Sequence, residues 1–566
     1  MTTTVREAPA PLPLQGGLTD PAHPDASNEP VLEIDQIQGN IVPGFNKDHQ
    51  TYLFLSIDDV DDFKAWLASQ VPFISTTAEV LTFNRLFKAI RDRRQVDSSA
   101  VKSTWMNIVF SSQGLGTIGT PTDGFDDEAF KDGLAARSLA DLLGDPIGDA
   151  DAPGNPANWV IGGPGDEADV VVIVAADDPE DLTDEIARIT GSLMGATLIF
   201  EQDGATLPDP LRGHEQFGFL DGVSQPGVRG RVSNDPHDVL TPRQNPNNRD
   251  QGKPGQDVLW PGTFVFGYPS QQANPDGENL RLEDPGPLSS AGDGLDWTIN
   301  GSFLVIRRLR QNVFALHSFL KETATDLSIP DPPTGVAADF VGSRLVGRWR
   351  SGAPVMRTPD QDDPDLALDD CANNNFEFQA DTPPIPPTGS PSPFDCRDDQ
   401  FPHSHKDPTG VRCPLTGHIR KVYPRDDESA SGGPLPNEVD TQTHRLLRRG
   451  LPFGESSPST PGDPQDDGIE DRGLVFLAYQ SSIVNGFEFV TRNWVNQPNF
   501  KDPNTGHDPI IGQNNVAGEN RERNFIVTEP NNGSAHVVTT QVDWVIPTGG
   551  GYFFAPSIDA LAMLAS

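Results

Sequence analysis

Residues 168–207, ADVVVIVAADDPEDLTDEIARITGSLMGATLIFEQDGATL, carry the pattern that decides the fold. The continuous apolar run at 168–176 is typical of a buried strand. An acidic, proline-containing turn then opens an amphipathic stretch at 177–193, which predicts a helix. The run at 196–207 predicts a second strand. The order is therefore strand, helix, strand.

The same order precedes this stretch. TYLFLSI at 51–57 alternates and is rich in β-forming residues, so it predicts a strand. Residues 58–71 open with aspartates and place apolar side chains at helical spacing. STWMNIVFSS at 103–112 predicts the next strand. Two strand–helix–strand units in succession indicate a ferredoxin-like α+β unit.

A second cycle follows in the C-terminal half. GSFLVIRRLRQ at 301–311 predicts a strand and residues 312–327 an amphipathic helix. GLVFLAYQSS at 473–482 predicts another strand and IVNGFEFVTRNWVN a helix, and GGGYFFAPSIDALAML closes with a strand and a short helix. The fold class is therefore α+β, with two ferredoxin-like units and long loop insertions. Shorter patterns predict a strand within 258–269 and short helices at 138–143 and 339–349.

Composition indicates how these units are spaced. Glycine and proline number 54 each among 566 residues, and hydrophobic residues make up 35%. We therefore expect a disordered tail over residues 1–30, an N-terminal unit over 31–212 and a C-terminal unit over 213–566. Long loops are expected at about 229–257 and 354–410.

The charge of the chain restricts its partners. Eighty-two acidic and 41 basic side chains give a formal net charge of −41. Phosphate repels such a surface, so we expect neither nucleic acid nor an anionic membrane as a partner. The same charge suits cationic partners, and we hypothesise Mn²⁺ or cationic dyes among them.

Cysteines and the N-terminus bear on the compartment. Cys371 and Cys396 could pair across a loop, but three cysteines form no disulfide framework, so we expect reduced thiols. Neither an apolar leader nor a run of about 18 apolar residues is present. We therefore expect a cytoplasmic protein, with secretion by another route left open.

The first candidate site lies in EQFGFLDGVSQPG, residues 215–227. Asp221 stands between Gly218 and Gly222, beside phenylalanines and a leucine. Glycines allow a tight turn and the close approach of a flat ligand. An unpaired carboxylate against an apolar wall has a raised pKa and can exchange a proton near working pH. By itself the stretch fits an ordinary Asp-Gly turn more often than a site.

The second candidate is His418 in CPLTGHIRKVYPR, residues 413–425. A neutral imidazole can bind a metal, and the neighbouring Arg420 could hold a ligand carboxylate. Other histidines are weaker candidates: His317 fits helix packing, and His403 and His405 lie in a polar loop. A structural role for His418 remains the commoner alternative when the stretch is taken alone.

The third candidate is Arg448, which follows two leucines in THRLLRRGLPFG, residues 443–454. An arginine held next to leucines needs an anion or a developing negative charge, unless it extends to solvent. Asp543 precedes a strand and is a candidate for supporting a metal-bound histidine through its second ring nitrogen. An ordinary exposed aspartate fits it equally well.

Together these residues suit one chemistry. Haem iron bound by His418 would leave one face open, where Asp221 could move a proton within hydrogen peroxide. Arg448 would stabilise the negative charge that develops as the O–O bond breaks.

GFLDG at 218–222 resembles the GxxDG motif of the dye-decolorising peroxidases. The resemblance runs from about residue 32 to the end and is strongest with the longer-chain branch of the family. The similar segments, in order, are IQGNIVPGF, EQFGFLDGVSQP, NGSFLVIRRL, LVGRWRSGAP, RCPLTGHIRKVYPR, RRGLPFG, GLVFLAYQSSI and GGGYFFAPS.

The resemblance implies two ferredoxin-like halves, with one non-covalent haem b in the second. It implies Asp221 as the acid–base, Arg448 as the distal arginine and His418 as the iron ligand. Matching positions also assign the pocket residues Gly222, Leu474 and Phe476, with Asp543 as the carboxylate behind His418. Arg420 or Arg348 would contact the haem propionates.

The implied activity is oxidation of bulky aromatic substrates, such as dyes and phenols, by hydrogen peroxide in one-electron steps. Large dyes do not fit a small distal pocket, so the resemblance also implies surface tryptophan or tyrosine relays. The candidates for such a relay are Trp260, Trp349, Tyr423 and Trp494. The alternative is a non-enzymatic haem-binding protein on the same fold. Mere binding would need His418 and a pocket but neither Asp221 nor Arg448.

Overall fold

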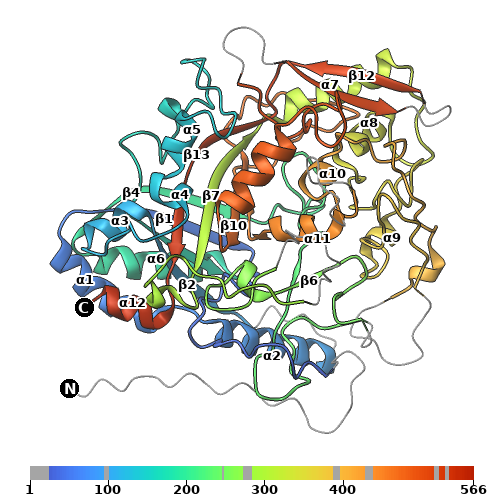
Figure 1. The fold of residues 1–566 in the computed structure, drawn as a ribbon. Coiled ribbons are helices and arrows are strands. Elements are labelled where there is room, and N and C mark those ends of the chain that lie inside the picture. The colour runs from blue at the N-terminus through green and yellow to red at the C-terminus, as the bar shows by residue number, and fades with distance from the viewer. Residues whose placement is uncertain are drawn as a thin grey trace.

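A long antiparallel sheet organises the molecule (Figure 1). The computed structural model describes residues 25–94, 101–244, 248–271, 284–385, 396–427, 437–515, 522–528 and 534–566. Within them the sheet has nine strands, in the order β4-β1-β3-β2-β13-β7-β10-β8, with β9 also pairing with β10. Two ferredoxin-like units account for this order, because each contributes four neighbouring positions.

The first unit supplies β4-β1-β3-β2, the ferredoxin-like order. Its strands are β1 (His49–Ile57), β2 (Thr104–Phe110), β3 (Val170–Ala176) and β4 (Ala196–Ala205). Its helices are α1 (Val60–Gln70), α2 (Thr77–Arg94), α3 (Ser112–Thr117), α4 (Glu128–Asp132), α5 (Leu134–Leu139) and α6 (Pro179–Ser192). Asp59 caps α1 and Asp178 caps α6, each accepting a backbone N–H. The predicted strands and main helices of this unit are confirmed, whereas α2 was not predicted and the helix expected at 138–143 lies earlier, as α5.

The second unit repeats the arrangement as β13-β7-β10, with β8 and β9 together in the fourth position. Its strands are β7 (Ser302–Gln311), β8 (Leu447–Arg448), β9 (Leu451–Phe453), β10 (Gly473–Gln480) and β13 (Val545–Ala555). Its helices are α7 (Val313–Asp326), α8 (Ala337–Val346), α9 (Pro364–Leu368), α10 (His418–Val422), α11 (Asn437–Thr441) and α12 (Ile558–Leu564). The units join where Phe554 of β13 pairs with Phe110 of β2. Two short additions lie outside the main sheet: β5 (Gly227–Val228) with β6 (Val258–Leu259), and the hairpin β11 (Arg523–Thr528)–β12 (Ala535–Thr540).

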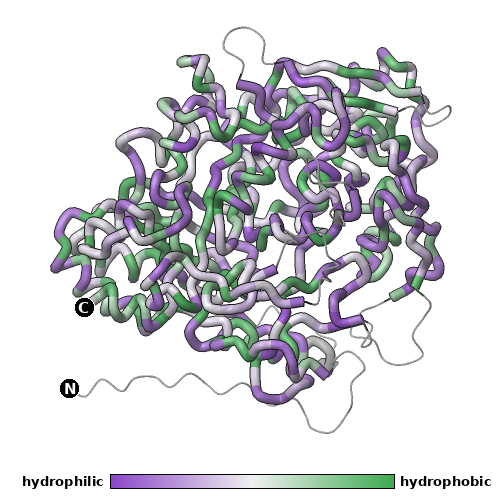
Figure 2. The backbone as a smooth tube through the Cα atoms, viewed as in Figure 1, coloured by the Kyte–Doolittle hydropathy of each residue, from purple (hydrophilic) through white to green (hydrophobic). Residues whose placement is uncertain are grey.

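Both faces of the sheet are covered, which explains the continuous apolar run in β3. Val170, Val172 and Val174 enter one core cluster, and Val171 and Ile173 enter the cluster on the other face. Side chains alternate between faces along a strand, so burying both faces removes the polar half of the usual pattern. In Figure 2 hydrophobic stretches follow the strands, and many outer turns are hydrophilic.

The connecting segments differ in detail from the predictions. A strand lies within 258–269 as predicted, but it is short, since only Val258–Leu259 pairs and the following residues form turns. The helix expected at 483–496 forms two π-helical segments, η7 (Val484–Glu488) and η8 (Val490–Val495). Within the expected loop 354–410, the described residues fold around buried phenylalanines, among them Phe376 and Phe378.

The expectation of reduced thiols is also wrong for two cysteines. Cys371 and Cys396 form a disulfide, because this loop brings their Cα atoms to 5.2 Å. Cys413 remains a free, buried thiol. No helix in the described part of the chain is long and apolar enough to cross a membrane.

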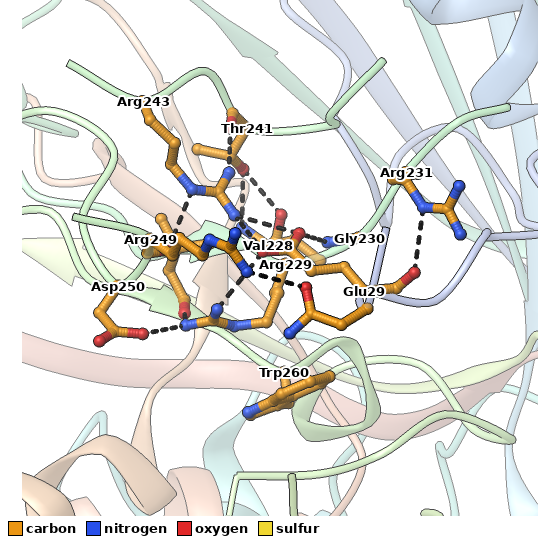
Figure 3. Close-up of polar contacts among 12 residues, drawn as sticks. Glu29, Val228, Arg229, Gly230, Arg231, Thr241, Arg243, Arg249, Asp250 and Trp260 are labelled. Atoms are coloured by element: carbon orange, nitrogen blue, oxygen red, sulfur yellow. Dashed lines mark hydrogen bonds and ion pairs between the residues drawn. The ribbon is translucent and has the colours of Figure 1, made fainter. Parts of the chain in front are cut away.

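The expected N-terminal tail ends earlier than predicted. Residues 1–24 lie outside the described residues, but residues 25–30 pack onto the fold. The Glu29 carboxylate is buried between two arginines (Figure 3). It lies 3.0 Å from Nη2 of Arg243 and 3.4 Å from Nη1 of Arg229, and Arg229 also pairs with Asp250. These ion pairs hold the segment around Glu29 against the β5–β6 region.

Candidate active site

A cavity of about 330 Å³ lies between the sheet of the second unit and α10. Alternating side chains of the sheet strands form one wall of this cavity. On β7 every second side chain faces the cavity, namely Arg307, Leu309 and Gln311. The neighbouring strands continue these rows, since Leu309 pairs with Leu474 of β10 on one side and with Pro547 of β13 on the other. Apolar side chains dominate the rest of the wall, including Phe217, Phe219, Leu220, Val346, Val422, Leu446, Phe487, Ile510 and Ile511.

The predicted pocket residues Gly222, Leu474 and Phe476 all line this cavity. Leu474 and Phe476 alternate with Val475, which is buried in the core on the opposite face of the sheet. The period-two pattern of GLVF therefore directs one set of side chains to the core and the other to the cavity.

Asp221 enters the cavity from a tight loop. Gly218 and Gly222 both have positive φ, +85° and +72°. The positive φ favours glycine at 218, and a Cβ there would also lie 1.9 Å from Nη2 of Arg350, so this arginine side chain would have to move. The Asp221 carboxylate accepts the Gly222 N–H at 2.6 Å. The glycines thus turn the backbone so that the carboxylate lines the cavity.

The loop that carries Asp221 is held by buried polar contacts. The two oxygens of Glu215 accept the N–H groups of Phe217 and Phe219, each at 2.9 Å. His317 of α7 lies 3.1 Å from the Phe217 carbonyl and 2.9 Å from Oγ of Ser459. Because a carbonyl can only accept, Nε2 of His317 carries the proton. His317 therefore has a structural role, which agrees with its expected place in the helix packing.

Arg448 lies beside Asp221. It belongs to β8, which pairs with β10. One guanidinium nitrogen is 3.4 Å from the Asp221 carboxylate, and the other donates to the Ser224 carbonyl at 2.8 Å. About a third of each of the two side chains is exposed, so the pair remains accessible from the cavity. The structure thus brings together two predicted site residues that are 227 positions apart.

His418 is the first residue of α10 and lines the same cavity. Its Nδ1 lies 2.8 Å from Oδ2 of Asp508, which is fully buried. The other Asp508 oxygen accepts the N–H groups of Ile510 and Ile511. Burial acts to lower the pKa of His418, but the charge and hydrogen bond of Asp508 outweigh it, and the net shift is upward. The contact assigns the proton to Nδ1 and leaves the Nε2 lone pair for a metal.

The prediction that Asp543 supports His418 is wrong. Asp543 lies 3.3 Å from Arg523, at the start of β13, and Asp508 holds the histidine instead. Sequence reasoning missed Asp508 because nothing in NTGHDPIIG distinguishes it from other loop aspartates. The two partners are 90 positions apart, and only the tertiary fold brings them together.

The prediction for Arg420 is also wrong. Its guanidinium is buried away from the cavity, where it contacts Asp427 at 2.5 Å and 2.8 Å and two backbone carbonyls. Helical spacing explains this, because Arg420 is two positions after His418 and so lies on another face of α10. Arg348 and Arg425 line the cavity instead. Burial, followed by the charge of Arg425, lowers the pKa of Arg348 to about 9.

The expected surface relays are not at the surface. Trp260, Trp349, Tyr423 and Trp494 are all buried, at 9% exposure or less. Tyr423 alone among them lines the cavity, and its hydroxyl donates to the buried carboxylate of Asp257.

The donor set of this cavity fits haem. A histidine with a fixed tautomer, as His418 is, would supply one iron ligand. The apolar walls suit a flat macrocycle. The pKa of Arg348 is lowered by burial and by a second arginine, and carboxylates placed there would relieve this repulsion.

Comparison with known proteins agrees with this assignment. Residues 36–202 match the family model of the DyP dimeric alpha+beta barrel domain, and residues 423–505 match that of the Dyp-type peroxidase C-terminal region. A dye-decolorizing peroxidase of Mycetinis scorodonius is 32% identical over 550 residues, which are 96% of this chain and 89% of the relative.

Solved structures give the same result. An ancestral D-type dye-decolorizing peroxidase is 33% identical, with a TM-score of 0.70, and the match covers 95% of this chain and all of that one. A variant of the dye-decolorizing peroxidase from Pleurotus ostreatus is 31% identical, with the same TM-score and coverage.

Fold and site therefore define a haem peroxidase rather than a haem carrier. The chain belongs to the dye-decolorizing peroxidase family.

Proposed function

We propose that the cavity binds one non-covalent haem b per chain, with Nε2 of His418 as the iron ligand. The observation that carries this proposal is one cavity lined by His418, whose Nδ1 is held by Asp508, and by the Asp221–Arg448 pair. The chain has no CxxCH motif, which favours non-covalent attachment. Arg348 and Arg425 would hold the haem propionates.

When bound, haem would let the enzyme give two electrons to hydrogen peroxide, which is thereby reduced. Asp221 moves the proton. Its carboxylate takes the proton from one peroxide oxygen and returns it to the other, which leaves as water. A carboxylate suits this role because its charge is restored when the proton is handed on. The tight loop around Asp221 keeps the two transfers within hydrogen-bond reach.

Arg448 stabilises the negative charge that develops on the departing oxygen. Its contact with Ser224 fixes one side of the guanidinium, so little reorientation is needed during the reaction. Hydrogen bonds from Asp508 to two backbone N–H groups likewise fix the orientation of His418. The protein thus supplies a pre-set proton acceptor, a cation and an oriented ligand.

We also propose bulky aromatic reductants, such as dyes and phenols, as the second substrates. Such reductants are too bulky to share a cavity of about 330 Å³ with haem, so they would donate electrons from outside it. Mn²⁺ is a further candidate reductant, supported by the net charge of −41. Saturable peroxide-dependent oxidation of Mn²⁺ tests that part, and its absence would remove it.

Haem titration followed by peroxide tests the main proposal. Purified protein is loaded with haem, the Soret band is recorded, and one equivalent of hydrogen peroxide is added. We expect stoichiometric binding at one haem per chain and a rapid change of the Soret band. Binding without that change would contradict a peroxidase, and His418→Ala binding haem as tightly as the parent would contradict the assigned ligand.

A further inference from the structure

Glu215 is a carboxylate of the cavity wall that the reaction described above does not use. It lies six residues before Asp221 on the same loop and lines the same cavity. Its two oxygens accept the Phe217 and Phe219 N–H groups, and one oxygen also accepts Nε2 of Gln311 from β7. A group with these contacts connects the loop of Asp221 to the sheet.

The side-chain amide of Gln311 can take part in this contact either as hydrogen-bond donor or as acceptor. Its Nε2 donates to Glu215, while its Oε1 is buried and has no hydrogen-bond partner within the described residues. A side-chain amide carries both a donor and an acceptor, and rotation about its last bond exchanges them. Turned over, the same amide would accept an O–H from a protonated Glu215. The pair can therefore remain hydrogen-bonded in either protonation state.

Burial favours the neutral form of Glu215. Withdrawal from water raises its pKa to about 7, and the charge of Asp221 adds to this shift, whereas the N–H groups of Phe217 and Phe219 and the Gln311 amide oppose it. Arg448 contacts Asp221, Arg307 pairs with Asp145 at 2.8 Å, and Arg350 lies near Gly218 and Asp339. Arg348 lines the same cavity and donates to the Gly352 and Asn373 carbonyls and to Asn374. No basic side chain among the described residues forms an ion pair with Glu215.

We propose that Glu215 is a positioning residue that works in its protonated form, with the Gln311 amide as its reversible partner, and that its ionisation sets the alkaline limit of peroxide cleavage. This inference rests on the proposed function of Asp221 and Arg448. Protonated Glu215 would hold a second proton on the cavity wall, on the same loop as Asp221, which moves the proton of peroxide.

The physical reason is repulsion between an ionised Glu215 and the negative charge that develops during peroxide cleavage. Peroxide cleavage develops negative charge on the departing oxygen, beside Arg448. A neutral Glu215 leaves that arginine to act on the oxygen, whereas an ionised Glu215 adds a second negative charge to a cavity that already holds Asp221. The sign follows from the direction of the shift. Below the raised pKa Glu215 is protonated and cleavage is fast, and above it Glu215 is ionised and cleavage slows.

The first test needs no haem. Infrared difference spectra of the haem-free protein are recorded between pH 5 and pH 9, a range chosen to bracket neutrality. We expect a carbonyl band of a protonated carboxyl group that disappears as pH rises through about 7 and that is absent in Glu215→Gln. Asp362→Asn is the matched control, since burial also raises the pKa of Asp362 but this residue lies outside the cavity, behind Gly218. A parent-minus-Glu215→Gln difference without a titrating carboxyl band would overturn the proposal, whereas bands common to both proteins belong to other buried carboxyl groups such as Glu438, whose pKa burial raises to about 8.

A second variant keeps the test decisive if Glu215→Gln does not fold. Gln311→Met removes the amide that would accept the Glu215 O–H. The carbonyl band should then shift to higher frequency, because a carboxyl group loses a hydrogen bond. An unshifted band in Gln311→Met would show that Gln311 is not the partner.

The second test uses the haem-loaded enzyme and separates this proposal from the proposed function. The rate of the peroxide-induced Soret change is measured against pH. We expect the parent to lose about tenfold in rate above neutral pH, a factor that corresponds to about one pKa unit of repulsion, and Glu215→Gln to keep its rate there. An alkaline limb that is equal in both proteins would overturn the role of Glu215. No Soret change in either protein at any pH would instead overturn the peroxidase assignment.

Discussion

Nδ1 of His418 lies 2.8 Å from Oδ2 of Asp508, and this contact decides which ring nitrogen faces the cavity. Asp508 is held in turn by two backbone N–H groups, so its carboxylate cannot turn away. A fixed carboxylate behind a histidine strengthens the histidine as a donor. The tautomer and orientation of His418, the proposed iron ligand, are therefore set by a loop that follows η8.

Asp508→Asn should weaken haem binding by about tenfold to a hundredfold, as for other residues that support a metal ligand. The amide oxygen still accepts the Ile510 and Ile511 N–H groups, but the NH₂ group faces the proton on Nδ1 of His418. Haem dissociation is measured by transfer to an excess of a competing haem acceptor.

Asp543→Asn is the control for that measurement. Asp543 pairs with Arg523 and not with His418, so haem transfer should match the parent. Equal effects of the two substitutions would mean that the carboxylate behind His418 does not control haem retention.

Asp221→Asn and Arg448→Leu should both keep haem and lose the reaction with peroxide. We expect a rate loss of about 10²–10⁴ for removing the group that moves the proton and of about 10²–10³ for removing the cation. Stopped-flow recording of the Soret change measures both, and it ranks two residues that sequence reasoning leaves unranked.

The double variant tests whether these residues act as a pair. Their side chains are 3.4 Å apart, so the two losses should not add. Additive losses would indicate independent roles. Parent-like rates in both single variants would contradict the mechanism.

Local patterns account for what could be predicted from the sequence. The strands around 51–57, 168–176, 301–311 and 473–482 are confirmed because each carries its own periodicity. Glycine-flanked Asp221 could be found for the same reason, since its conformation is specified by its neighbours. The ferredoxin-like class follows from the order of these elements alone.

Contacts between distant segments account for the errors. Asp508 and Asp543 are both loop aspartates near hydrophobic runs, and only the fold brings one of them to His418. Arg420 follows Ile419 and Arg348 precedes Trp349, yet Asp427 holds the first and the second lines the cavity. Neither neighbour indicates which anion the arginine meets in the fold.

Arg348→Gln should weaken haem binding by about tenfold to a hundredfold, the range expected when a hydrogen bond to a charged group is lost. Burial and the charge of Arg425 lower the pKa of Arg348 to about 9, so a haem carboxylate would stabilise its charged form. In the haem-free protein Arg348 donates to the Gly352 and Asn373 carbonyls and to Oδ1 of Asn374, so the substitution should also lower thermal stability.

Arg420→Gln is the matched comparison. This substitution leaves Asp427 buried with one fewer cation and should lower the free energy of unfolding by about 3 kcal/mol. Haem affinity should fall only to the extent that the fraction of folded protein falls. If Arg420→Gln weakened haem binding and left stability intact, the sequence-based assignment of Arg420 would be right after all.

His317 should make stability depend on pH in the acidic range. It is 1% exposed, and burial lowers its pKa to about 4, while the hydrogen bond to the Phe217 carbonyl opposes the shift. The unfolded chain, with an ordinary histidine pKa of about 6.5, binds the proton first. The contribution of His317 to the free energy of unfolding is therefore fully present above about pH 6.5. It is lost as pH falls toward 4, by about 3 kcal/mol in total. Denaturant unfolding at a series of pH values measures this, as a difference between the parent and His317→Gln.

Glutamine is the informative replacement because it can donate to Phe217 and accept from Ser459 without titrating. The parent should lose stability relative to His317→Gln across this window, and the two curves should run parallel above it. His405→Gln serves as control, since that side chain is 61% exposed and its removal should not change the slope. Because His317 holds the loop of Asp221, acid should also slow the peroxide reaction in the parent more than in His317→Gln. Parallel curves at every pH would mean that His317 is not kept neutral in the folded protein.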